Sequence, residues 1–201
     1  MIVAAFWGAA AGGVLGLLGL FFGGSRGTRS AGGLVALLGL FLALLCGLAA
    51  IVPRRVSNER NAAATLQTAA SAQSYFREFD VDRNGVKDYW RADIAGLYTV
   101  NESKLIEITL ALADERPASD LSQIGARAPK ARYWFRALRF ADEKQPDPER
   151  WAACAIPEDP RQATFLITHE GPMYMRKGRH ALELVPSPAA LKRDWGPPVF
   201  P

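Results

Sequence analysis

Two long stretches near the start of the chain contain no charged residue, and they restrict the fold more than any other feature. Residues 1–24 and 31–52 are almost wholly apolar, and all 20 acidic residues of the chain lie in 54–201. Each stretch exceeds the ~20 residues that a helix needs to cross the hydrocarbon core of a bilayer. The sequence therefore predicts a transmembrane helical hairpin in residues 1–53, with spans at about 2–24 and 31–52 and the lipid bilayer as its partner.

A cleaved signal peptide is the rival interpretation of the first stretch. That stretch lacks a basic start, exceeds a typical signal core and precedes a second full span, so a membrane hairpin is favoured. Arg26 and Arg29 in the loop at 25–30 favour a cytoplasmic loop with both ends of the chain outside. Arg54, Arg55 and Arg60 oppose this orientation, so charge counting leaves the topology open.

Small residues recur on one face of the first span. Gly8, Gly12 and Gly16 follow one another at every fourth position, where a neighbouring helix can approach closely. Two partners fit this face: the second span of the same hairpin, or another protomer or subunit of a membrane complex.

After the second span, Pro53 is expected to break or kink the helix. Residues 56–79 then predict an amphipathic helix, so that the second span and this helix form a stem of roughly fifty residues. We expect one stripe of the stem to face the domain core; its members are Ala62, Leu66, Ala69, Phe76 and Phe79.

The rest of 54–201 predicts short helices followed by strands. Helices are expected from 90 or 93 to 98 and around 105–113, with a loop at 114–130 that is rich in proline, glycine and aspartate. Strands are expected at 132–140, 151–156, 163–168, 173–176 and 181–185, and an extended tail at 195–201. The fold class is therefore α+β, with the long stem helix packed on an antiparallel β-meander.

An acidic motif lies where the stem is expected to end. Asp80, Asp82, Asn84, Gly85 and Asp88 alternate oxygen ligands with a glycine at the sixth position, a spacing that suits calcium. Arg91 stands where an EF-hand has a bidentate glutamate, so a weak structural Ca²⁺ site or a plain polar turn is expected. The candidate ligands are Asp80, Asp82, Asn84, the Val86 carbonyl, Asp88 and, in place of the missing glutamate, Asp93.

No residue pattern indicates catalysis. The only two histidines are His169 and His180, and the sequence has no zinc, nucleophile-elbow or phosphate-loop motif. Cys154 lies in an apolar run and predicts a buried thiol. A membrane-tethered hydrolase would require a site around His169, Glu170 and Asp159. The bases and aromatics of 130–140 favour a strand with one wet face, and no nucleic-acid partner is expected.

The region from residue 56 onward resembles pilin-like exported domains of planctomycete-type bacteria. The stretch 56–73, VSNERNAAATLQTAASAQ, is similar to their helical opening, and 130–140 and 164–174 resemble a later strand and the closing hairpin. The resemblance implies a non-enzymatic domain outside the cytoplasm. Gly33 is not followed by the glutamate of processed pilins, which implies a stem that stays fixed in the membrane.

Together these features predict an envelope protein of the bacterial cytoplasmic membrane with a periplasmic or extracellular C-terminal domain. Its expected role is structural or in assembly, and not enzymatic. The alternative is an accessory subunit of a larger membrane complex, which docks through Gly8, Gly12 and Gly16.

Overall fold

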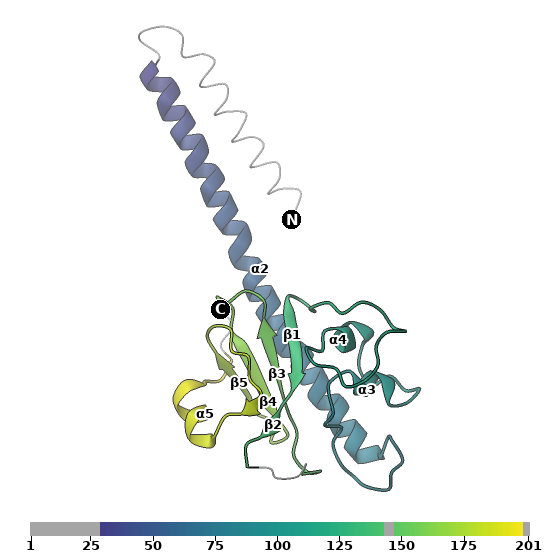
Figure 1. Cartoon of the computed structure of the whole chain (residues 1–201). Helices are drawn as coiled ribbons and strands as arrows, with labels where there is room; N and C mark the ends of the chain where they lie inside the picture. The colour runs from purple at the N-terminus through teal and green to yellow at the C-terminus, as the bar shows by residue number, and fades with distance from the viewer. Residues whose placement is uncertain (1–28, 143–146, 199–201) are drawn as a thin grey trace. The chain divides into compact units, whose positions relative to one another are not determined.

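The computed structural model describes residues 29–142 and 147–198, with side chains for 38–44 and from residue 55 onward (Figure 1). The chain divides into two compact units, Met1–Val56 and Ser57–Pro201, close to the boundary expected at residues 53 and 54. The second unit contains the sheet and almost all of the side chains that the structure describes.

The expected membrane hairpin lies largely outside the described residues. This holds for the whole first span at 2–24, with Gly8, Gly12 and Gly16, and for most side chains of 31–52. In the part of the chain that the structure describes, no helix has both the length and the apolar character of a membrane span.

Helix α2 (Arg29–Phe79) has 51 residues, about the combined length expected for the second apolar stretch and the helix that follows it. A break at Pro53 is wrong, because the helix continues through this residue, whereas a kink there stays a prediction. Proline removes one backbone hydrogen bond and crowds the preceding turn, at a cost of ~3 kcal/mol. The long helical segments on both sides of Pro53 provide enough hydrogen bonds to maintain the helix across that gap.

The C-terminal part of α2 packs on the sheet through the expected stripe. Ala62, Leu66, Ala69 and Phe76 are all buried in the main core. Phe79 is an exception, since 58% of it is exposed. It lies in the last turn of the helix, and Asp80 turns the chain away with a φ of 45°. The Phe79 ring stacks on Tyr75.

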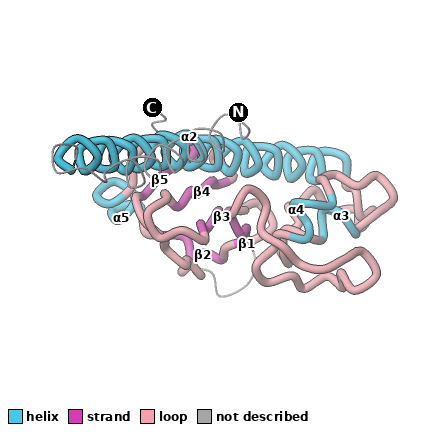
Figure 2. The backbone as a smooth tube through the Cα atoms, turned by 90° about the horizontal axis from the view of Figure 1, so that it is seen from above, coloured by secondary structure: helices cyan, strands magenta, loops and turns pink. Residues whose placement is uncertain are grey.

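A four-stranded antiparallel sheet in the order β1-β3-β4-β5 forms the second layer (Figures 1 and 2). Its turn at 169–172 makes the expected hairpin, in which Phe165 pairs with Met175. A separate parallel pair, β2 with β6, departs from a pure meander. The strands are β1 (Tyr133–Ala137), β2 (Arg139–Phe140), β3 (Ala152–Pro157), β4 (Thr164–Thr168), β5 (Met173–Arg176) and β6 (Leu184–Val185).

Both faces of the sheet are covered. On β3, Ala153 and Ala155 belong to the core that contains α2, whereas Cys154 and Ile156 belong to a second core. Side chains alternate along a strand, so this division means that each face contacts a different layer. The second core is completed by Leu138, which lies between β1 and β2, and by residues of β2, β6 and the C-terminal region, namely Phe140, Val185 and Trp195.

Three short helices complete the unit: α3 (Gly96–Thr99), α4 (Ile108–Leu112) and α5 (Pro188–Asp194). Helix α4 falls within the segment expected around 105–113, and α3 overlaps the other expected segment but extends one residue past its end at 98. No strand or helix interrupts 115–129. Helix α5 was not expected from the sequence, although Ser187 and Pro188 form a recognisable start. The Ser187 hydroxyl accepts a hydrogen bond from the Ala190 N–H at 3.3 Å.

The tail from residue 195 follows the expected extended path as far as it is described. Gly196 exchanges two backbone hydrogen bonds with Met175, of 2.7 and 3.0 Å. The tail thereby adds to the free edge of β5, and an edge that is paired in this way is protected from other strands.

The packing of α2 predicts unequal costs for two phenylalanines in its last turns. Phe76→Ala should reduce the free energy of unfolding by about 3–5 kcal/mol, because it empties a fully buried site. Phe79→Ala is the matched control and should cost about 1 kcal/mol or less, since its ring is largely exposed. Urea denaturation of the full chain in detergent measures both changes. Equal losses would contradict the packing of α2 described above.

Candidate functional site

The acidic loop that follows α2 closes on itself through hydrogen bonds. The Asp80 carboxylate accepts from the Asn84 N–H at 3.1 Å and from the Gly85 N–H at 3.0 Å. The Asn84 side-chain carbonyl accepts from the Val86 N–H at 2.7 Å. Gly85 has a φ of 82°, a conformation that favours glycine. These residues therefore have a backbone role in ending the helix.

Two carboxylates of this loop have oxygens that no donor satisfies. The Oδ1 atoms of Asp82 and Asp88 are shielded from solvent and have no hydrogen-bond partner in the described part of the chain. Burial raises the pKa of Asp82 above its ordinary value, and the neighbouring carboxylates of Asp80 and Asp88 raise it further. The carboxylates of Asp80 and Asp88 therefore lie near enough to Asp82 to act on its charge.

Asp93, the expected replacement for the missing glutamate, has a different role. Its Oδ1 accepts from the Trp90 indole N–H at 2.9 Å and the Gly96 N–H at 2.8 Å. Its Oδ2 accepts from the N–H groups of Ala118 and Ser119, both at 2.7 Å. With four donors on a buried carboxylate, a place for Asp93 in a calcium site has no support.

The metal site as a whole stays a prediction. Among residues 29–142 and 147–198, no three His, Cys, Asp or Glu side chains are grouped so as to bind a metal ion together. The loop residues Asp80, Asp82, Asn84, Val86 and Asp88 remain adjacent in the structure, and the backbone interpretation of their pattern also fits.

The sequence does not predict the network of buried hydrogen bonds around Asp93, which we call the polar frame. The Asp114 Oδ2 accepts from the N–H groups of Ile94 and Ala95, at 2.7 and 2.9 Å. Burial raises the pKa of Asp114. The Gln73 side-chain amide pairs with both backbone groups of Trp90. These partners lie 17–20 residues apart in the sequence, which leaves no local signal for them.

Gly96 is required within this frame for steric reasons. A Cβ at this position would lie 2.0 Å from the Trp90 Nε1, which is the atom that donates to Asp93. Any side chain here would displace the indole from its acceptor. The frame therefore depends on one aspartate, one tryptophan and the absence of a side chain at residue 96.

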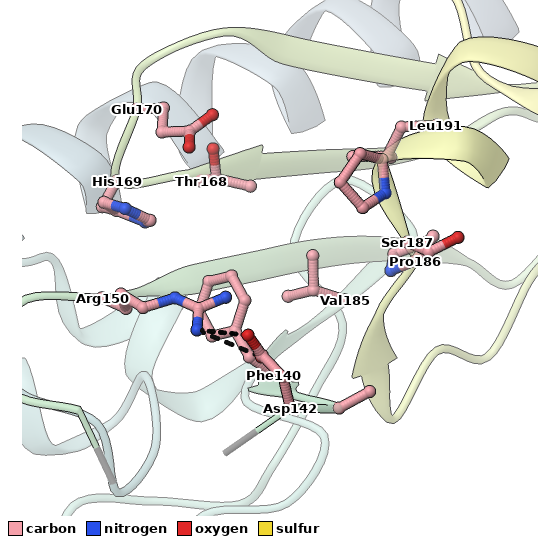
Figure 3. A pocket seen from close by; sticks show the side chains of 12 residues that line it. Phe140, Asp142, Arg150, Thr168, His169, Glu170, Val185, Pro186, Ser187 and Leu191 are labelled. Atoms are coloured by element: carbon pink, nitrogen blue, oxygen red, sulfur yellow. Dashed lines mark hydrogen bonds and ion pairs between the residues drawn. The ribbon is translucent and has the colours of Figure 1, made fainter.

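A pocket of about 430 Å³ lies on the other face of the sheet (Figure 3). The Arg150 guanidinium lies 3.8 Å from the centre of the Phe140 ring and pairs with Asp142 at 3.0 Å. The Thr168 hydroxyl and the His169 Nδ1 have no hydrogen-bond partner among the described residues. Its other lining residues are mainly apolar and include Val185, Pro186, Pro188 and Leu191.

Of the residues considered for a hydrolase, His169 and Glu170 line this pocket and Asp159 does not. His169 and Glu170 follow β4, whereas Asp159 precedes that strand and pairs with Arg161 at 2.9 Å. Cys154 is buried on β3, as expected, and burial raises its pKa to about 12. Its thiol is therefore protonated at neutral pH and is a poor nucleophile.

Comparison with protein-family models, with curated proteins and with solved structures finds no match for this chain.

The polar frame predicts a large effect of one aspartate. Asp93→Ala should lower the free energy of unfolding by about 3–5 kcal/mol, because four N–H groups lose their acceptor. Asp120→Ala is the matched control: Asp120 accepts from the Ser122 N–H in an exposed turn, and its loss should cost about 1 kcal/mol or less. Chemical denaturation of the full chain measures the difference. A small effect of Asp93→Ala would contradict the role assigned to it.

Proposed function

We propose that this chain is a non-enzymatic, membrane-anchored envelope protein that holds a pilin-like α+β domain outside the cytoplasmic membrane. The observation that carries the proposal is the continuity of α2 over 51 residues. One helix joins the apolar sequence 31–52, where a membrane span is predicted, to the buried stripe that supports the sheet. Such a helix suits a stem that fixes a domain to a bilayer.

The use of polar groups in the second unit supports a structural role. Asp93, Asp114 and Gln73 form hydrogen bonds with backbone groups of the segment between α2 and β1. The titratable residues considered for a hydrolase do not lie together in the sequence, since His169 and Glu170 follow β4 and Asp159 precedes it. A long helix packed on an antiparallel sheet also agrees with the resemblance to pilin-like domains.

A second candidate role is that of an accessory subunit in a larger membrane complex. The glycine-faced stretch at Gly8, Gly12 and Gly16 favours it. Purification in mild detergent separates the two roles. A display protein elutes without stoichiometric partners or as a homo-oligomer, whereas an accessory subunit elutes with a different chain.

The display role predicts a topology. We expect the loop at 25–30 in the cytoplasm and residue 189, which is exposed on α5, outside it. In a chain with Cys46→Ala and Cys154→Ala, Ala189→Cys should react in intact cells with a thiol reagent that cannot cross membranes. Ser25→Cys is the control and should react only after lysis. If residue 189 also reacts only after lysis, the display role is wrong.

We also propose that the loop at 80–88 binds calcium weakly and fixes the end of the stem. The support is the spacing of the oxygen donors in the sequence, together with one shielded oxygen on each of Asp82 and Asp88 that has no donor among the described residues. Asp80, Asp82 and Asp88 would supply carboxylate oxygens, and Asn84 and Val86 carbonyl oxygens. Without Asp93 or a bidentate glutamate, an affinity of about 10⁻⁴–10⁻³ M is expected.

This site predicts a calcium-dependent stability. At ten times the dissociation constant, calcium should stabilise the domain by about 1.4 kcal/mol and raise the unfolding midpoint by about 3–6 °C. Thermal unfolding of the full chain in detergent, with calcium or with chelator, measures this shift. Asp82→Asn should abolish the shift and the exposed control Asp120→Asn should retain it. The same midpoint with and without calcium in the wild type would leave only a polar turn.

A further inference from the structure

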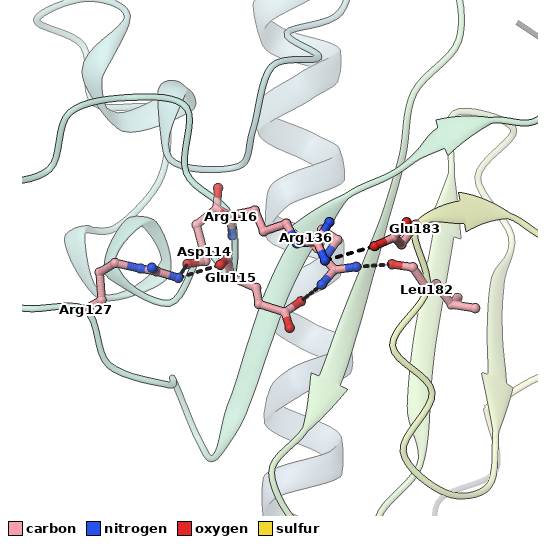
Figure 4. A network of polar contacts seen from close by, with 7 residues as sticks. All are labelled: Asp114, Glu115, Arg116, Arg127, Arg136, Leu182 and Glu183. Carbon is pink, nitrogen blue, oxygen red and sulfur yellow. Dashed lines mark hydrogen bonds and ion pairs between the residues drawn. The ribbon is translucent and has the colours of Figure 1, made fainter.

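A second cavity, of about 270 Å³, is dominated by arginine. It lies between the segment before α3 and strands β1 and β2. Its charged lining consists of four guanidinium groups and two carboxylates: Arg91, Arg116, Arg136, Arg139, Asp93 and Glu183. Figure 4 shows part of this lining, where Arg116 and Arg136 come from different segments and lie close together beside Glu183.

The carboxylates near this cavity are already engaged. Glu183 pairs with Arg116 at 2.9 Å, and Asp93 accepts four N–H groups within the polar frame. Glu115, just outside the lining, pairs with Arg136 at 2.6 Å. Arg139 on β2 has no ion-pair partner in the described part of the chain. The cavity therefore retains an excess of positive charge.

Arg136 is the buried arginine of the cavity lining, with only 7% of its side chain exposed. One terminal nitrogen donates to the Leu182 carbonyl at 2.6 Å, and the other faces Glu115 (Figure 4). Its Nε–H is shielded from solvent and has no acceptor among the described residues. These contacts correct the expected strand with one wet face, since Arg136 is inside the fold.

We propose that this cavity binds a phosphate-sized oxyanion. Guanidinium groups present planar forks of N–H donors that match the oxygens of such an anion, and a concave site with excess positive charge concentrates anions. Arg139 and Arg116 supply exposed N–H donors at the cavity, and the buried Arg136 adds a further positive charge. The phosphate is either the free ion or a phosphate monoester such as a lipid headgroup fragment. This site is independent of the proposed display role.

Calorimetry with the full chain in nonionic detergent tests the site, with sodium phosphate titrated at constant ionic strength against sodium chloride. We expect saturable binding of one phosphate per chain. Arg139→Gln should weaken it about tenfold, as expected when one charge-assisted hydrogen bond is lost, and its exposed, unpaired side chain leaves the fold intact. Arg193→Gln is the matched control, because Arg193 is exposed on α5 and pairs with its neighbour Asp194.

Two results would overturn the proposal: no saturable binding of phosphate to the wild type, or the same affinity in Arg139→Gln as in Arg193→Gln. A parallel titration with glycerol 1-phosphate distinguishes the sources. Tighter binding than that of inorganic phosphate supports a monoester, and weaker binding supports the free ion.

Discussion

The contact between α2 and one face of the sheet is the interaction on which the rest of the second unit depends. The helix presents three small side chains, Ala62, Ala69 and Ala72, on the same buried face as the larger Leu66 and Phe76. On the sheet, the residues of β3 in the same core, Ala153 and Ala155, are also small. These residues are buried in one core, so each of the larger side chains is costly to remove. The aromatic residues Tyr133, Phe135 and Phe165 then fill the space beside this contact.

The long segment between α2 and β1 has little regular structure, and buried polar side chains hold it in place. Asp93, Asp114 and Gln73 accept hydrogen bonds from backbone N–H groups of this segment. An unpaired buried N–H is costly, so these three side chains replace the hydrogen-bond ladder of a sheet. Gln73 also lies on α2, which links the irregular segment directly to the helix that organises the core.

Sequence patterns predict the regular elements well and the polar contacts poorly. Periodicity identifies the stripe of α2 and the hairpin of β4 and β5, because these elements repeat apolar residues at fixed spacing. Periodicity fails for Phe79. This residue follows the spacing of the stripe, but it is the last residue of α2 and its ring stays largely exposed. Asp93 and Arg136 were misjudged for another reason: their partners at residues 118–119 and 182 are brought to them only by the tertiary fold. The spacing of residues 80–88 fits both a calcium loop and a helix-ending turn, and the hydrogen bonds of Asp80 agree with the second.

Native-state hydrogen exchange of the full chain tests most directly whether α2 and the sheet form one cooperative unit. The backbone amides of Leu66, Gln73 and Phe76 should be protected to the same free energy as those of Phe165 and Ile167 on β4, which pair with strands on both sides of it. Equal protection is the result that this account predicts, because neither layer retains a core without the other. Exchange of the α2 amides through a separate opening of much lower free energy, with β4 still protected, would contradict it.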